Sequence, residues 1–260
     1  MAGGESVQRA MEILELLAGE PRGRTLPAIA GHLGATESGT KRLLETLTRV
    51  GYVSVDIATD TYSTTLKLGA LGLRRIESIG IGQWAQPTLD RLADRTHELV
   101  RLAMLSDQRL HWIAKAQGSN SRLTLDPTSG TDAVPHATAS GKAWLFTLDP
   151  GDVATLLGQT GLPAQTEHTI TDLARLQQDL AASRERGYAL GREENDVGVN
   201  AIAAPIRVAG ATGPAVGTVS VAGPAVRLAS ADLISLVPDL LAAAGELGAS
   251  WSSYGRLTHR

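Results

Sequence analysis

Apolar residues in the first 51 positions recur at the three- and four-residue spacing of amphipathic helices. The first predicted helix covers residues 6–18, with Ser6 as a candidate N-cap. Its apolar stripe consists of Val7, Ala10, Met11, Leu14, Leu17 and Ala18. Thr25 caps a second predicted helix, which ends at Gly34.

A third helix is predicted between the N-cap Thr36 and Gly51. Its inner face carries Leu43, Leu44, Leu47 and Val50. Three short helices with a tight turn between the last two predict a helix-turn-helix. Two alternating runs, residues 52–55 and 61–64, then flank an Asp-containing turn and predict a β-hairpin. A hairpin in this position is a wing, so residues 1–65 are predicted to form a winged helix-turn-helix DNA-binding domain.

Residues 66–98 have a helical pattern in two pieces, interrupted by glycines and Pro87. We interpret residues 66–80 as a linker helix, and the second piece as the start of another domain that extends over residues 81–260. Apolar positions nearly encircle the linker. Such a helix usually packs on something, and we expect its copy in a homodimer.

From Leu99 onward the pattern changes to strands and helices. Residues 99–106 and 109–116 alternate around a turn, residues 123–125 read as a strand, and a helix begins near Ser140. Residues 171–187 form an amphipathic helix, residues 187–206 and 217–223 read as strands, and Ser230 caps a final helix. The order predicts an α+β domain with a central antiparallel sheet flanked by helices.

The composition indicates in which compartment the protein works and which partners it can have. The chain of 260 residues has no cysteine, which excludes disulfides and thiol catalysis and fits a cytoplasmic protein. Its start lacks the features of a signal peptide, and no apolar stretch approaches the ~20 residues of a membrane span, so we expect no membrane partner. The net charge is −3, and residues 1–66 hold six Lys or Arg against eight Asp or Glu. This balance argues against DNA binding without excluding it, because phosphate contacts need only a few cations on one face.

Four segments together resemble the IclR family of bacterial transcriptional regulators. They are SVQRAMEILELL near the start, TESGTKRLLETLTRVGYV at 36–53, HATASGKAWL at 136–145 and GYALGREENDVGVNAIAAPI at 187–206. The resemblance covers residues 5–250 in order. It implies a winged helix-turn-helix, a dimerising linker helix and a GAF-like domain that binds a small effector. It also implies a homodimer or a dimer-of-dimers tetramer on a double-stranded DNA operator.

The third helix supplies the candidate DNA contacts. Its outward face and the loop before the second helix contribute Arg24, Thr36, Glu37, Ser38, Gly39, Thr40, Lys41 and Arg42. Arg42 can reach a phosphate or a guanine. Glu37 is unusual there, and two interpretations stay open: it discriminates bases by accepting from a cytosine amino group, or it caps the helix and turns away from the groove.

The resemblance also maps an effector pocket onto ten residues of the C-terminal domain. They are Arg122, Leu125, Thr138, Ala139, Ser140, Gly191, Val199, Ala201, Ser220 and Ala222. Thr138, Ala139 and Ser140 are expected to offer backbone N–H groups to an anion at a helix start. Of the acidic pair Glu193 and Glu194, at least one is expected to be structural, because two carboxylates would repel an acid. Small apolar walls favour a planar or aromatic ligand with one polar end.

The predicted function is a ligand-responsive regulator, and more specifically a repressor, of a catabolic operon, with a small organic acid or aromatic carboxylate as effector. Two alternatives remain. The winged helix could be a protein–protein module, which the acidic N-terminal balance favours, or the α+β domain could be a hydrolase. The hydrolase lacks support, since Ser140 and Lys142 on one helix would point about 200° apart. No catalytic residue, cofactor or metal site is predicted.

Overall fold

The computed structural model describes residues 2–125, 130–211 and 213–254. The chain divides into two compact units, residues 1–78 and 79–260. Among the described residues, no helix combines the length and hydropathy that crossing a bilayer requires.

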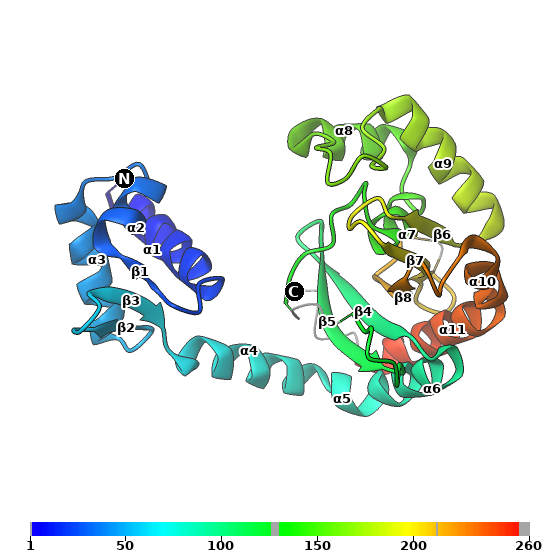
Figure 1. Ribbon diagram of the computed structural model, residues 1–260, viewed down its shortest axis with the longest axis horizontal. Coiled ribbons are helices and arrows are strands. Elements are labelled where there is room, and N and C mark those ends of the chain that lie inside the picture. Colours follow the sequence, from blue (N-terminus) through cyan, green and yellow to red (C-terminus); the bar gives the residue numbers. More distant parts are fainter. Residues whose placement is uncertain (1, 126–129, 212, 255–260) are drawn as a thin grey trace. The chain divides into compact units, whose positions relative to one another are not determined.

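The first unit is a winged helix-turn-helix, as predicted (Figure 1). Its helices are α1 (Ala2–Ala18), α2 (Leu26–His32) and α3 (Glu37–Arg49). The wing strands β2 (Val53–Asp56) and β3 (Thr61–Thr64) pair antiparallel, and the two-residue strand β1 (Arg24–Thr25) adds to β3. The short β1 was not predicted, because two residues carry no readable alternation.

Aliphatic side chains from all three helices and the wing form the core of this unit. The buried members are Ile13, Leu14, Leu17, Ile29, Leu44, Leu47 and Val53. Four predicted core positions are wrong: Val7, Met11 and Val50 are 61%, 52% and 46% exposed, and Ala18 is exposed as well. The helix α1 begins at Ala2 rather than after Ser6, so Ser6 is not its N-cap. The buried stripe of α1 includes Ile13, which the prediction had left out.

The helical segment after the wing has three pieces instead of the predicted two. They are α4 (Leu66–Ile79), α5 (Ile81–Trp84) and α6 (Gln86–Thr96). Gly80 separates α4 from α5 with a left-handed φ of 73°, a conformation that glycine adopts without steric penalty. On α4, Leu66 and Leu73 are exposed.

The second unit is built on a five-stranded antiparallel sheet in the order β5-β4-β8-β7-β6. Its strands are β4 (Leu99–Ser106), β5 (Arg109–Gln117), β6 (Ala189–Arg192), β7 (Val199–Ile206) and β8 (Gly217–Pro224). Asp107 and Gln108 join β4 to β5 with φ angles of 49° and 60°, as a two-residue hairpin turn requires. Two predictions are corrected here. Residues 187–206 form the hairpin β6–β7 rather than one strand, and residues 123–125 are not a strand.

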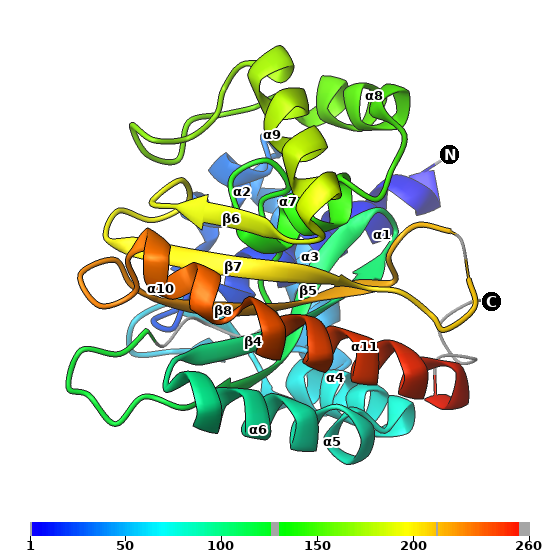
Figure 2. The same cartoon turned by 90° about the vertical axis from the view of Figure 1, so that its right-hand side faces the viewer.

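Helices cover both faces of this sheet, which confirms the predicted α+β class (Figures 1 and 2). On one side lie α7 (Ala139–Leu145), α8 (Pro150–Thr160) and α9 (Leu173–Arg186), and on the other lie α6, α10 (Ser230–Ser235) and α11 (Val237–Tyr254). The prediction missed α8, although Pro150, Val153 and Leu157 carry a helix start and an i, i+4 apolar pair. The N-cap of the final helical segment is Ala229, not Ser230.

The strand pleat decides which side chains face α7. Alternate residues of a strand point to opposite faces, so Ser220 and Ala222 of β8 share the face that Val219 and Val221 do not. In register, Ser220 lies between Arg101 of β4 and Ala203 of β7. These three side chains therefore lie on the α7 side of the sheet.

Candidate functional site

The exposed face of α3 carries the candidate DNA contacts of the first unit. Thr36 is its N-cap and accepts a hydrogen bond of 3.3 Å from the backbone N–H of Gly39. Glu37, Ser38, Lys41 and Arg42 are exposed. No described acidic side chain forms an ion pair with Lys41 or Arg42, which leaves both cations available.

Thr40 has to be removed from this set. Its side chain is fully buried, and no described residue hydrogen-bonds its hydroxyl group. The sequence contained the signal, because Thr40, Leu44 and Leu47 lie at i, i+4 and i+7 on one helical stripe. Thr40 therefore faces the core instead of the groove.

The other basic and acidic groups of this unit are less suited to bind phosphate. Arg24 is half-buried and forms an ion pair with Glu20. The wing turn carries Asp56 and Asp60 and has no Lys or Arg. The backbone N–H of Ala58 donates to Asp56 and is the main cause that holds the pKa of this carboxyl below its usual range. The wing tip is therefore anionic, whereas α3 presents the exposed cations Lys41 and Arg42.

The second unit contains a cavity, partly open to solvent, between α7, the sheet and the β6–β7 turn. It is lined by Arg101, Trp112, Ala137, Thr138, Ala139, Ser140, Gly191, Glu194, Asn195, Asp196, Val199, Ala201, Ser220 and Ala222. Eight of the ten predicted effector residues are in this set. Arg122 and Leu125 are not, since residues 121–125 form a bent loop in which the carbonyl of Leu125 accepts from Gln117.

Arg101 is the main feature of the cavity that the sequence did not reveal. Its guanidinium group stacks on the ring of Trp112, 3.7 Å from the ring centroid. No described residue accepts a hydrogen bond from its buried Nε. Burial lowers the pKa of Arg101 to about 10, and the charge of Asp196 opposes this shift. The group is therefore still a cation at neutral pH, in a place where water solvates it poorly.

Three further polar atoms of the lining are buried without a partner among the described residues. They are Oγ of Ser220, Nε1 of Trp112 and Oδ1 of Asn195. Ser220 is only 2% exposed. A buried polar atom without a hydrogen bond costs about 1–3 kcal/mol, so four such atoms around one cavity indicate a place where a polar ligand binds.

The start of α7 lines the cavity through Thr138, Ala139 and Ser140, the residues from which anion contacts are predicted. Thr138, rather than Ser140, is the N-cap, and its hydroxyl accepts the N–H of Gly141 at 2.9 Å. On the facing strand, a Cβ at Gly191 would lie 3.2 Å from the N atom of Ala139. Glycine at 191 therefore lets β6 approach α7 closely.

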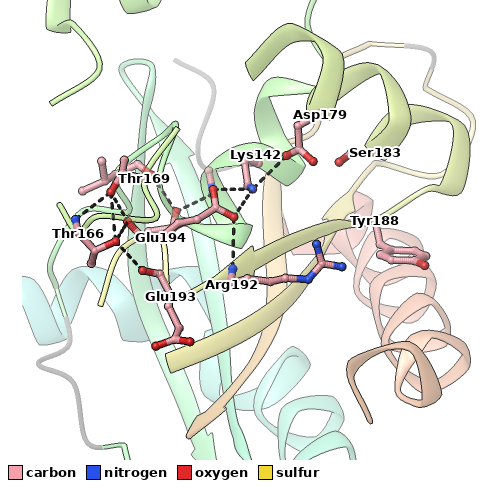
Figure 3. A network of polar contacts seen from close by, with 12 residues as sticks. Lys142, Thr166, Thr169, Asp179, Ser183, Tyr188, Arg192, Glu193 and Glu194 are labelled. Carbon is pink, nitrogen blue, oxygen red and sulfur yellow. Dashed lines mark hydrogen bonds and ion pairs between the residues drawn. The ribbon is translucent and has the colours of Figure 1, made fainter. Parts of the chain in front are cut away.

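A buried ion pair holds the wall of the cavity in place (Figure 3). Lys142 of α7 is 1% exposed, donates to both carboxylate oxygens of Glu194 at 2.8 Å and forms an ion pair with Asp179 of α9 at 3.0 Å. Oε1 of Glu194 also accepts the N–H of Arg192 at 3.2 Å. The ammonium group thus joins two helices and the β6–β7 turn.

The same turn is fixed from outside the ion pair. Thr169 donates to the carbonyl of Glu194 and Thr166 to that of Glu193, both at 2.6 Å (Figure 3). The carboxylate of Glu193 accepts the N–H of Gly198 at 2.8 Å, which closes the turn. Both acids therefore have structural contacts. Among the described residues, no group of three or more His, Asp or Glu side chains could hold a metal ion.

Both the N-terminal and the C-terminal part of the chain match a known protein family. Residues 6–56 match the model of the IclR helix-turn-helix domain, and residues 73–249 match that of the bacterial transcriptional regulator IclR C-terminal domain. The chain belongs to the IclR family. The family likeness predicted from four sequence segments is thus confirmed, and the chain is a member of a family of transcriptional regulators.

Two curated relatives and one solved structure show the breadth of the likeness. The HTH-type transcriptional regulator BhcR of Paracoccus denitrificans is 34% identical, over 94% of this chain and 86% of its own. The DNA-binding transcriptional repressor YiaJ of Escherichia coli is 30% identical, over 79% and 73%. An IclR homologue from Microbacterium hydrocarbonoxydans, solved with 4-hydroxybenzoate, shares the fold with a TM-score of 0.76, 22% identity, and coverage of 95% and 99%.

Replacing Lys142 by Met tests the buried ion pair. The variant leaves Glu194 and Asp179 without their cation, and breaking a buried pair in this way costs about 3–5 kcal/mol. We expect the free energy of unfolding, measured with urea, to fall by that amount. Arg91→Met is the matched control, because the ion pair of Arg91 with Glu246 is half exposed and is worth at most about 1 kcal/mol. Equal losses in the two variants would contradict the assignment.

Proposed function

We propose that this IclR-family protein is a repressor that binds operator DNA through α3 and binds a small organic acid in the cavity of its C-terminal domain. The observation that carries the proposal is Arg101, a desolvated cation that lines the cavity and whose Nε finds no acceptor among the described residues. The cavity and the helix α3 belong to separate units of the chain.

An organic acid fits the lining better than a neutral ligand. A carboxylate would supply the acceptor that Arg101 lacks, and charge-assisted pairs of this kind are about twice as strong as neutral hydrogen bonds. The ring of Trp112 and the small side chains Ala201 and Ala222 would contact the apolar part of the acid. The homologue solved with 4-hydroxybenzoate supports an organic acid as the ligand.

On the DNA side, Lys41 and Arg42 are the proposed phosphate or base contacts. Thr36, Glu37, Ser38 and Gly39 form the end of α3 that enters the major groove, and Arg24 has a minor role because of its ion pair with Glu20. A homodimer, or a tetramer built from two dimers, would place two α3 helices in successive major grooves about 34 Å apart. The exposed leucines of α4 are the proposed dimer contact.

The proposed effector domain binds and releases its ligand without turning it over, in the cytoplasm, where operator DNA lies. The name of the relative YiaJ supports repression, and control of a catabolic operon follows from an organic acid as effector. A protein–protein role for the winged helix is less favoured, because Lys41 and Arg42 are exposed and form no ion pair with a described residue.

Replacing both Lys41 and Arg42 by Ala tests DNA binding. With DNA from the promoter region of its own gene, we expect the Kd to rise at least about tenfold, since one good Arg–base pair is worth about 1–3 kcal/mol. The slope of log K against log salt should flatten by about 0.9 for each lost phosphate contact. Arg175→Ala removes an exposed cation of the second unit as a control. Unchanged affinity in the double variant would rule out α3 as the DNA-reading element.

Replacing Arg101 by Met tests the acid site. In the wild type, an acid at 100 times its Kd should raise the free energy of unfolding by about 2.7 kcal/mol. We expect this gain to vanish in the variant. Without ligand the variant should differ from the wild type by less than about 1 kcal/mol, because the loss of the Trp112 stack opposes the relief of desolvation.

The control for the acid site is Arg175→Met, which removes an exposed cation of α9 away from the cavity. It should keep the full ligand-induced gain. Retention of that gain in Arg101→Met would show that the acid binds elsewhere. A panel of aliphatic and aromatic acids that stabilises no form of the protein would contradict an acid effector altogether.

A further inference from the structure

The cavity combines a cation with acceptors of hydrogen bonds. Arg101, Trp112 and Ser220 contribute donor groups to the lining. Asn195 and Asp196, from the β6–β7 turn, contribute acceptors to the same lining. A ligand that is only a carboxylate satisfies the first set and leaves the second set without a donor.

The orientation of the Asn195 side chain is fixed by its neighbour. Its Nδ2 donates to Oδ2 of Asp196 at 2.7 Å, and the reverse orientation would place two acceptors against each other. Oδ1 is therefore the atom left over. It is buried and receives no hydrogen bond from any described residue, so a donor group on a ligand would satisfy it.

Asp196 adds charge to this requirement. It is exposed, and its carboxylate acts electrostatically on Arg101, although no ion pair joins the two among the described residues. A carboxylate bound to Arg101 would be repelled by Asp196. A hydroxyl or ammonium group on the same ligand would offset this repulsion, because it can donate a hydrogen bond to Asp196 or Asn195.

The ion pair of Lys142 makes this arrangement rigid. Glu194, which precedes Asn195, is held by Lys142 at 2.8 Å and by Thr169 at 2.6 Å. The turn therefore cannot easily withdraw Asn195 and Asp196 from the cavity. Preorganised acceptors discriminate strongly against a ligand without the matching donor, because they would stay buried and unpaired.

We propose that the effector is a small carboxylic acid that also carries an O–H or N–H donor close to its carboxylate: a hydroxy acid or an amino acid, not a plain carboxylic acid. This inference rests on the proposed function, because it assigns the ligand class of the same cavity. Arg101 binds the carboxylate, and Asn195 with Asp196 selects the donor.

Two series of acids that differ in one group test the proposal. Propionate, lactate and alanine share one carbon skeleton, and phenylpropionate, phenyllactate and phenylalanine share a larger one. The Kd of each acid for the full-length protein is measured by calorimetry. In at least one series we expect the hydroxy acid or the amino acid to bind about tenfold or more tighter than the plain acid, the gain of one hydrogen bond to a charged group. If the hydroxy acid binds more tightly than the amino acid, the donor is a hydroxyl group; if the amino acid binds more tightly, the donor is an ammonium group.

Variants assign the discrimination to the turn. Asp196→Asn should reduce the advantage of an amino acid, and Asn195→Leu that of a hydroxy acid. Asn195→Leu should keep the affinity for the plain acid, and Asp196→Asn should keep or raise it, because that variant removes the repulsion. That retained affinity shows that the variants are folded. Asp152→Asn, an exposed acid on α8, is the matched control and should change nothing.

The outcomes separate this inference from the proposed function. Equal affinities of all three acids in both series would overturn the donor requirement and leave an acid effector intact. Binding of plain acids alone would do the same. If no member of either series binds at millimolar concentration, the proposed ligand class is wrong, and the wider acid panel then decides on the acid effector itself.

Discussion

The buried ammonium group of Lys142 is the interaction on which the candidate effector site depends. It has no access to water and is compensated by Glu194 and Asp179 from two other parts of the chain. A charge in such a place is stable only while its partners stay within hydrogen-bond distance. The position of α7 relative to α9 and to the β6–β7 turn is therefore fixed, and with it the shape of the cavity.

The polar groups that line the cavity, unlike Lys142, are not fully paired. Its charged and polar groups, with Arg101 foremost, are left without partners among the described residues. The pairing of Lys142 stabilises the frame, whereas the unpaired groups of the cavity destabilise the free protein and are compensated when a ligand binds. A ligand that binds the complete cavity therefore favours the conformation of the protein that contains this cavity.

The fold could be predicted largely from periodicity, because helices and strands of ten or so residues impose their period on the sequence. Thr36 as N-cap of α3 and Ser220 with Ala222 on one face of β8 follow from local geometry. Arg101 could not be found in this way. Its role depends on the pairing of β4 with β8, which lie more than a hundred residues apart, and on the stack with Trp112 from β5.

The errors have equally local causes. The strand expected at 123–125 has no partner in the sheet, and Thr40 was assigned to the surface by its polarity although its position on the helix places it in the core. Residues 187–206 were predicted as one strand, whereas the chain reverses after Arg192, where Glu193 and Gly198 adopt left-handed φ angles of 55° and 78°.

If an acid in the cavity controls DNA binding through α3, each ligand must change the affinity of the protein for the other. The most direct test measures the Kd for operator DNA with and without a saturating acid, and the Kd for that acid with and without DNA. Coupling requires both to change by one common factor, about 5- to 150-fold for typical allosteric proteins. An acid that binds through Arg101 and leaves the DNA affinity unchanged would contradict the account.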